Sequence, residues 1–147
     1  MKKADAKLLR EVQKNARTAT KALDALAGKI YDDDLALLLA RQSLRYAEIG
    51  NRAADKLLGG HAKTYQDNAI EDMMLIGGIH TNTLFNTSTS HIAEMAILGS
   101  SRGINQLCRV LHAQENALQG AGKFATEMAK ELMDFEEKNI EQLKKYL

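Results

Sequence analysis

Apolar side chains return every third or fourth residue over most of this chain, which is the spacing of one face of an α-helix. The first stripe consists of Leu9, Val12, Ala16, Ala19, Leu23, Leu26 and Ile30. Gly28 and the three aspartates 32–34 follow it, and carboxylates at such a place cap free amides and oppose the positive end of a helix dipole. We therefore expect a first helix that ends near Gly28 and a second that starts at about Asp33.

The second stripe predicts a helix from about Asp33 to Leu58 with two polar residues on its inner face. Its inner positions are Leu35, Leu39, Gln42, Tyr46, Ile49, Ala53 and Leu57. Because buried polar groups need hydrogen-bond partners, we expect Gln42 and Tyr46 to meet polar groups in the middle of the next helix, which contains residues 80–91. The two glycines that open residues 59–68 predict a loop there, with Asp67 or Asn68 capping the next helix.

Residues 69–98 predict a third helix that contains the least charged part of the chain. The 29 residues 73–101 carry one formal charge, on Glu94, although the chain as a whole is 27% charged. The ends of this stretch are apolar, and residues 80–91 are mostly small polar side chains with two histidines. Because a helix that is apolar on several sides is usually covered by neighbours, we expect residues 69–98 to form one buried central helix.

A fourth helix completes the pattern. Residues 99–103, Gly-Ser-Ser-Arg-Gly, are expected to break the third helix, and residues 104–116 could either extend that helix or begin the fourth. The last stripe consists of Leu118, Ala121, Ala125, Met128, Leu132, Phe135, Asn139, Leu143 and Tyr146. The chain is therefore expected to be all-α, an antiparallel four-helix bundle formed by a single domain of residues 1–147, with either simple up-down connections or one long crossover.

Composition and charge narrow the function classes. The absence of proline and the 5% aromatic content favour helix over sheet, and the net charge of +1 gives little electrostatic reason to bind nucleic acid. We expect no membrane span, because the uncharged stretch is polar in its middle and no basic cluster flanks it. The charged start of the chain has no apolar signal core, so we expect a cytoplasmic protein.

The uncharged stretch also holds the candidate chemistry. On one continuous helix, His80, His91 and Glu94 would share a face, and the last two, one turn apart, could ligate one metal ion. We favour the interpretation that these groups form a hydrogen-bonded polar layer, and a small-molecule site in the same polar region is a further possibility. The candidate ligand-binding residues are Gln42, Tyr46, His80, Thr83, Thr87, His91 and Glu94.

The closing segment, residues 132–147, resembles the last helix of ferritin-like bundles, in which a Glu-x-x-His motif is followed by a leucine and a charged tail. The resemblance implies the ferritin-like fold, whose members hold a di-iron or di-manganese centre with carboxylates and histidines from four helices. In this sequence Glu136 matches the motif's glutamate, Asn139 stands where its histidine should be, and no Glu-x-x-His occurs anywhere. We therefore expect no metal cofactor; the alternative is a site for iron, manganese or zinc. Its ligands would be His80, His91, Glu94 and Glu136.

The sequence thus predicts a non-catalytic binding or scaffold protein. The uncharged stretch is apolar on more sides than one small bundle can easily cover, so we expect a homo-oligomer, a dimer or larger. No nucleic acid or membrane partner is expected, and the nature of a small-molecule ligand stays open.

Overall fold

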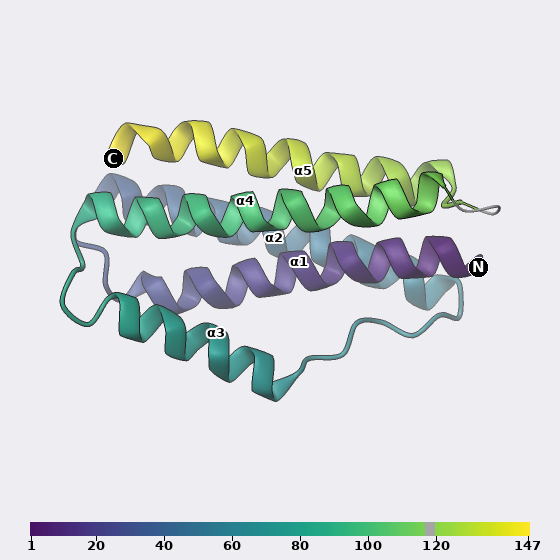
Figure 1. Cartoon of the computed structure of the whole chain (residues 1–147), viewed down its shortest axis with the longest axis horizontal. Helices are drawn as coiled ribbons and strands as arrows, with labels where there is room; N and C mark the ends of the chain where they lie inside the picture. The colour runs from purple at the N-terminus through teal and green to yellow at the C-terminus, as the bar shows by residue number, and fades with distance from the viewer. Residues whose placement is uncertain (117–119) are drawn as a thin grey trace.

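The computed structural model describes residues 1–116 and 120–147, and over these residues it contains helices and no strand (Figure 1). The helices are α1 (Lys3–Ala27), α2 (Asp33–Gly59), α3 (Ala69–Asn82), α4 (Thr89–Glu115), α5 (Lys123–Leu143) and the short 3-10 helix η1 (Lys144–Tyr146). The expected all-α class is confirmed. In the described part of the chain, no helix has the length and apolar character needed to cross a membrane.

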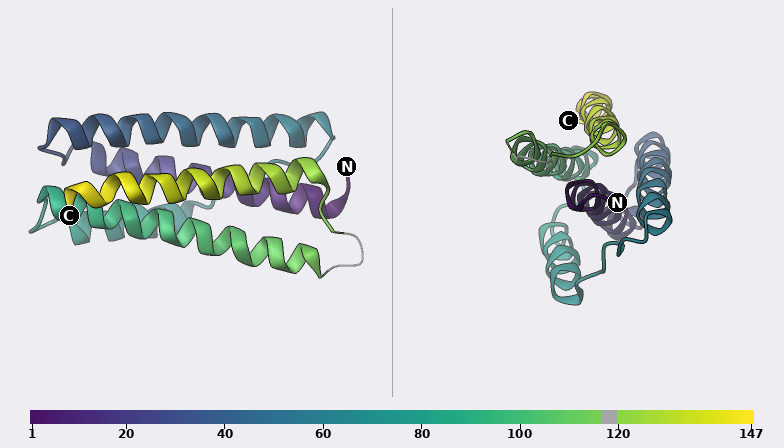
Figure 2. Two further views of the ribbon diagram at one scale, coloured as in Figure 1. Left: turned by 90° about the horizontal axis from the view of Figure 1, so that it is seen from above. Right: turned by 90° about the vertical axis from the view of Figure 1, so that its right-hand side faces the viewer.

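The helix α1 lies at the centre of the arrangement and contacts each of the other four α-helices. Seen end-on, α2, α4 and α5 surround α1 on one side, and α3 lies alone on the other side (Figure 2). The helix α2 ends at the end of the molecule opposite to the one where α4 begins, so residues 60–88 run back along its whole length (Figure 1). The connection is therefore a long crossover, and α3 is part of it.

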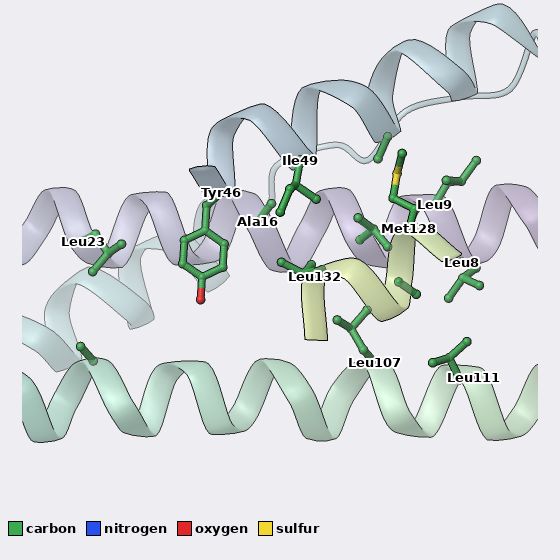
Figure 3. Close-up of a cluster of buried hydrophobic side chains, with 14 of the residues drawn as sticks. Leu8, Leu9, Ala16, Leu23, Tyr46, Ile49, Leu107, Leu111, Met128 and Leu132 are labelled. Carbon is green, nitrogen blue, oxygen red and sulfur yellow. The ribbon is translucent and has the colours of Figure 1, made fainter. Parts of the chain in front are cut away.

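One cluster of buried hydrophobic side chains joins the helices (Figure 3). All seven inner positions expected for the second helix are buried in α2, and α1 and α5 bury most of their predicted stripes. The helices α1 and α2 approach closely at Gly50, where an added Cβ would lie 3.0 Å from the Cβ of Ala16. Leu118, which was expected in the last stripe, lies outside the described residues.

The helix starts follow the predicted caps. The side chain of Asp32 accepts a hydrogen bond from the Leu35 amide at 2.8 Å, and Asn68 caps the first amides of α3 in the same way. Both side chains satisfy amides that the first turn of a helix leaves free. The predicted boundaries of α2 and the loop before α3 are therefore confirmed.

The polar side of α1 holds the first part of the crossover in place. Gln13 accepts a hydrogen bond from the Tyr65 amide at 2.7 Å, and Lys21 contacts the carboxylates of both Asp67 and Asp72, at 2.9 and 2.7 Å. Arg17 also pairs with Asp67, and hydrogen bonds from Lys21 and Arg17 lower the pKa of that carboxyl group. The basic residues of the first helix thus have a structural role in the chain itself.

The prediction of one helix over residues 69–98 is wrong. The helix α3 ends at Asn82 and α4 begins at Thr89, because short polar side chains between them bond the backbone in place of the helical ladder. The side-chain amide Nδ2 of Asn82 donates to the Gly78 carbonyl at 3.0 Å, and the Ser88 hydroxyl accepts from the backbone amide of His91 as the cap of α4. The many side-chain hydroxyls and amides of this segment indicate a break in the helix, and they are a stronger signal than its low charge.

The expected burial of this stretch is wrong for its first half, which lies in the crossover. Only Ile79 is a buried residue of α3, and the loop after it is largely exposed. The exposed large apolar side chains of the crossover are Ile70, Met73, Met74, Ile76, Leu84 and Phe85. The physical reason is topological: half of the uncharged stretch lies in the crossover, outside the four long helices, and only the half in α4 faces the core.

The predicted break at residues 99–103 does not occur, since this segment lies within α4 together with residues 104–115. The question of where residues 104–116 belong is thereby answered: they continue the helix that starts at Thr89. Small residues are needed here because other helices come close. Ser100 lies 3.3 Å from the Tyr46 hydroxyl of α2, and Gly103 faces the Glu136 carboxyl group of α5.

Candidate functional site

A buried group of polar side chains lies in the core between α2, α4 and α5. The Tyr46 side chain points from α2 toward α4 (Figure 3). Its hydroxyl donates to Glu136 Oε2 at 3.1 Å, lies 3.3 Å from Ser100 Oγ and accepts a long hydrogen bond of 3.5 Å from Asn139 Nδ2. Its ring packs edge-on against Phe135, with centroids 4.8 Å apart. We call Tyr46, Ser100, Glu136 and Asn139 the polar centre.

Glu136 is held against the backbone of α4. A Cβ atom added at Gly103 would lie 2.3 and 2.7 Å from the two Glu136 carboxyl oxygens and 2.8 Å from Asn15 Nδ2. Asn15 of α1 donates to the Gly103 carbonyl at 3.0 Å, so its amide is also part of this contact. The Glu136 side chain therefore occupies the space that any other residue at position 103 would fill.

Burial dominates the electrostatics of the polar centre. Removal from water raises the pKa of Glu136 to about 8, although the Tyr46 hydroxyl and the Asn15 amide oppose the rise. Burial and the neighbouring Glu136 also raise the pKa of Tyr46 above its usual value. At neutral pH the centre is therefore mostly uncharged, with a protonated carboxyl group.

Two buried polar atoms, one within this centre and one on the preceding turn of α2, make no hydrogen bond within residues 1–116 and 120–147. They are Gln42 Nε2 and Glu136 Oε1, and both side chains are more than nine-tenths buried. Most buried polar atoms in folded proteins have a partner, because leaving one unpaired costs about 1–3 kcal/mol. The pair marks this region as a place where a further polar group would be stabilised.

A cleft of about 560 Å³ between α1, α3 and α4 reaches the polar centre. Its polar wall contains Asn15, Gln42, Tyr46, Ser100 and Gly103. Its apolar wall includes Ala19, Ala22, Leu23, Leu26, Leu75, Ile79, Met95 and Ala96. The cleft exists because α3 and α4 both pack on α1 but leave a space between them, and its volume is in the range of small-molecule sites, roughly 300–1,000 Å³.

The structure brings together only some of the predicted ligand-binding residues. Gln42 and Tyr46 line the cleft, as the ligand hypothesis requires. Thr83 is buried but its hydroxyl donates to the Ile79 carbonyl at 2.7 Å, Thr87 is half-buried in the loop, and His80 is exposed. These last three do not line the cleft.

The residues of the alternative metal site are not assembled. His91 Nε2 lies 2.8 Å from the Asn82 carbonyl, so the imidazole connects the end of α3 to the start of α4. Glu94 is exposed, and Glu136 lies beside Gly103, which is about 14 Å farther along α4 at 1.5 Å per residue. Over the described ranges, no group of three or more His, Cys, Asp or Glu side chains could hold a metal ion.

The polar centre does not fit the di-metal centre that the ferritin-like resemblance implies. Such a centre takes a carboxylate from each of four helices and two histidines. The polar centre offers one carboxyl group, Glu136, which is mostly protonated at neutral pH, together with Tyr46, Ser100 and Asn139. Hard divalent ions favour several ionised oxygen ligands, so these donors suit hydrogen bonding to an organic group better than ion binding.

Sequence reasoning missed three residues of this region: Asn15, Ser100 and Gly103. It also expected the partners of Tyr46 in the middle of the uncharged stretch, whereas they lie at Ser100, Glu136 and Asn139. The spacing of Ser100 and Gly103, one turn apart inside an amphipathic stripe, is typical of a close helix contact and could have indicated the site.

Comparison of the chain with protein-family models, with curated proteins and with solved structures gave no significant match.

Proposed function

We propose that this protein is a cytoplasmic, non-catalytic ferritin-like bundle that has no di-metal centre and binds an uncharged amphipathic small molecule. The long crossover between α2 and α4 supports the ferritin-like assignment, because that fold has one such connection. Glu136 and Asn139 support it too, since they face the core at the places where the family's motif would put its ligands.

The binding proposal rests on the cleft, which has one apolar wall and one polar wall. One wall is apolar and suits the hydrocarbon part of a ligand. The other contains Gln42, whose unpaired Nε2 is a donor, and Tyr46, whose hydroxyl belongs to the polar centre. A ligand with a carbonyl or ether oxygen at one end would satisfy Gln42 and bury its apolar part in the same step.

The expected ligand is uncharged because a buried ion would have no opposite charge to meet. Glu136 is mostly protonated at neutral pH, and the described residues of the polar centre include no Lys or Arg. The charged side chains among the cleft residues are half-buried or exposed: Glu11, Lys14, Glu71, Asp72 and Arg102. Transfer of an unpaired ion to such a place is costly, so neutral ligands are favoured.

The test is a fluorescence titration with Nile red, a neutral dye that has a carbonyl acceptor. We expect saturable binding to the wild-type protein and at least a tenfold weaker affinity for Ala22→Phe, because Phe fills the apolar part of the cleft. Ala40→Phe is the matched control, since Ala40 is an exposed residue of α2 outside the cleft, and it should bind like the wild type.

A second variant tests the polar wall. Gln42→Leu removes the unpaired amide, so the free energy of unfolding should not fall, while the affinity for Nile red should fall severalfold. The proposal is refuted if the dye does not bind saturably, or if Ala22→Phe binds it as the wild type does.

A further inference from the structure

We propose that the exposed apolar face of α3 is the interface with a second copy of this chain, in which the two α3 helices pack antiparallel across a two-fold axis. This inference is independent of what the cleft binds. The interface residues are Ile70, Met73, Met74 and Gly77, which recur with helical spacing on α3, and Leu84 and Phe85 in the loop that follows it.

The exposed area is the size that a stable dimer needs. The five large side chains of this face are 68–95% exposed. With full areas of roughly 200 Å² each, they offer roughly 700–800 Å² per copy. A standard interface buries about 800 Å² from each partner, and monomers rarely expose an apolar patch larger than roughly 300–600 Å².

The charge pattern favours a second copy over other occupants. Residues 73–93 carry no formal charge, and the chain has no Lys or Arg between Lys63 and Arg102. A membrane-surface helix normally has basic residues along its polar face, which this segment lacks, and the acidic residues Glu71 and Asp72 lie only in the first turn of α3. A second copy brings the same surface, so over residues 73–85 the pairing desolvates no ion, and a two-fold axis places this patch against itself.

The composition of α3 supports the same conclusion. An isolated helix of this length, 14 residues, is marginal in water, and Gly77 and Gly78 lower its helix propensity further. Within its own chain α3 buries only Ile79, so its apolar side contributes little to its stability. A Cβ added at Gly77 would meet nothing within 4 Å, which leaves room for the backbone of a second helix to approach.

The antiparallel orientation follows from the acidic start of α3. Glu71 and Asp72 lie in its first turn, and a parallel pair would bring both acidic ends together. In the antiparallel pair these ends lie at opposite ends of the contact, and the first turn of one α3 faces the uncharged end of the other.

Sedimentation equilibrium of the full chain tests the proposal. We expect twice the chain mass of 16.2 kDa for the wild type and the single-chain mass for Met73→Glu, because the new carboxylate would be buried against its own copy. Leu44→Glu is the matched control: Leu44 is as exposed as Met73 but lies on α2, and this variant should stay dimeric. A monomeric wild type, or a Met73→Glu variant that stays dimeric, overturns the proposal.

A crosslink provides a second test that does not depend on loss of binding. In a Cys108→Ser background, Gly77→Cys should form an intermolecular disulfide under mild oxidation, because position 77 lies near the two-fold axis, while Leu44→Cys should not. If Gly77→Cys crosslinks no more readily than Leu44→Cys, the result counts against the antiparallel pair. Binding of a monomeric wild type to phosphatidylcholine vesicles would assign the face to a membrane and overturn the proposal.

The proposal of ligand binding in the cleft and the proposal of a dimer through α3 can be refuted independently of each other. Met73 does not line the cleft, so a monomeric Met73→Glu variant should still bind Nile red. Loss of dimerisation with retained dye binding is therefore the combined result expected for this variant.

Discussion

Gly99 and Gly103 lie one turn apart in α4, and substitution by alanine is expected to change the stability of the protein in opposite directions at the two positions. At Gly103, an added methyl group would overlap the Glu136 carboxyl group at 2.3 Å and approach Asn15 Nδ2 at 2.8 Å. At Gly99, the same methyl group would meet nothing within 4 Å. The pair therefore separates the helix propensity of alanine from the steric cost of the contact with Glu136.

The magnitudes follow from these two surroundings. Alanine in place of glycine gains about 1 kcal/mol in a helix interior, so Gly99→Ala should stabilise the protein by about 0.5–1 kcal/mol. At Gly103 the same gain is offset by overpacking, which costs about 1–3 kcal/mol, and Glu136 cannot move away without losing its hydrogen bond to Tyr46. We expect a net loss of about 1–2 kcal/mol for Gly103→Ala.

Urea denaturation followed by circular dichroism measures both values, and thermal unfolding should shift by roughly 4 °C per kcal/mol for a chain of this size. The double variant Gly103→Ala/Glu136→Ala should recover part of the loss, because the truncated side chain leaves space for the new methyl group. Equal stability of Gly103→Ala and Gly99→Ala would refute the close contact between Glu136 and the backbone of α4.

Three further predictions concern the polar centre and the crossover. Tyr46→Phe should lower the free energy of unfolding in urea by about 1–3 kcal/mol, because it leaves Glu136 Oε2 buried without its donor. The folded-state pKa of Glu136, about 8, lies above the ordinary 4.5, so the folded state keeps a proton that the unfolded state releases between these values. The free energy of unfolding should therefore fall from pH 5 to pH 8 by at most about 1.4 kcal/mol per pH unit and level off above pH 8. Glu136→Gln should abolish this slope, whereas Glu137→Gln, at an exposed position, should keep it. Asp67→Asn should speed amide hydrogen exchange in residues 60–82 by weakening the contacts with α1, and equal exchange in Asp67→Asn and in the exposed control Asp55→Asn would contradict that role.

The sequence predicted those parts of the fold in which the local pattern of apolar and polar residues matches the burial of the side chains. The stripes of the first, second and last helices lie on the core side of α1, α2 and α5, because each of these helices has one apolar and one polar face. The caps at Asp32 and Asn68 were predictable for the same reason, since a short polar side chain before an apolar stripe satisfies the free amides of the first turn.

The third helix was mispredicted because a low density of charge has two physical origins. In the half that belongs to α4, uncharged residues such as Ile92 and Ala93 are buried in the core. In the half that belongs to the crossover, residues such as Met73 of α3 and Phe85 of the loop after it are exposed. Periodicity within one chain cannot separate these cases, because the difference depends on where the crossover places α3.

The candidate site was predicted in part. Gln42 and Tyr46 were identified because they interrupt an apolar stripe, and they do line the cleft. Their neighbours were not found, because the contact between Gly103 and Glu136 joins residues 33 positions apart, and nothing in either local pattern indicates the other. The contribution of Asn15 is similarly set by the packing of α1 on α4 and not by its own sequence context.

The long crossover has a consequence for the order in which the molecule can assemble. The pairs α1–α2 and α4–α5 are each joined by a few residues, so either hairpin can form with only local chain closure, whereas bringing the two hairpins together requires residues 60–88 to span the whole length. Tyr46 belongs to the first hairpin, and Ser100, Glu136 and Asn139 belong to the second. The hydrogen bonds around the tyrosine therefore exist only after the hairpins have docked, which makes the environment of this one side chain a spectroscopic reporter of complete assembly.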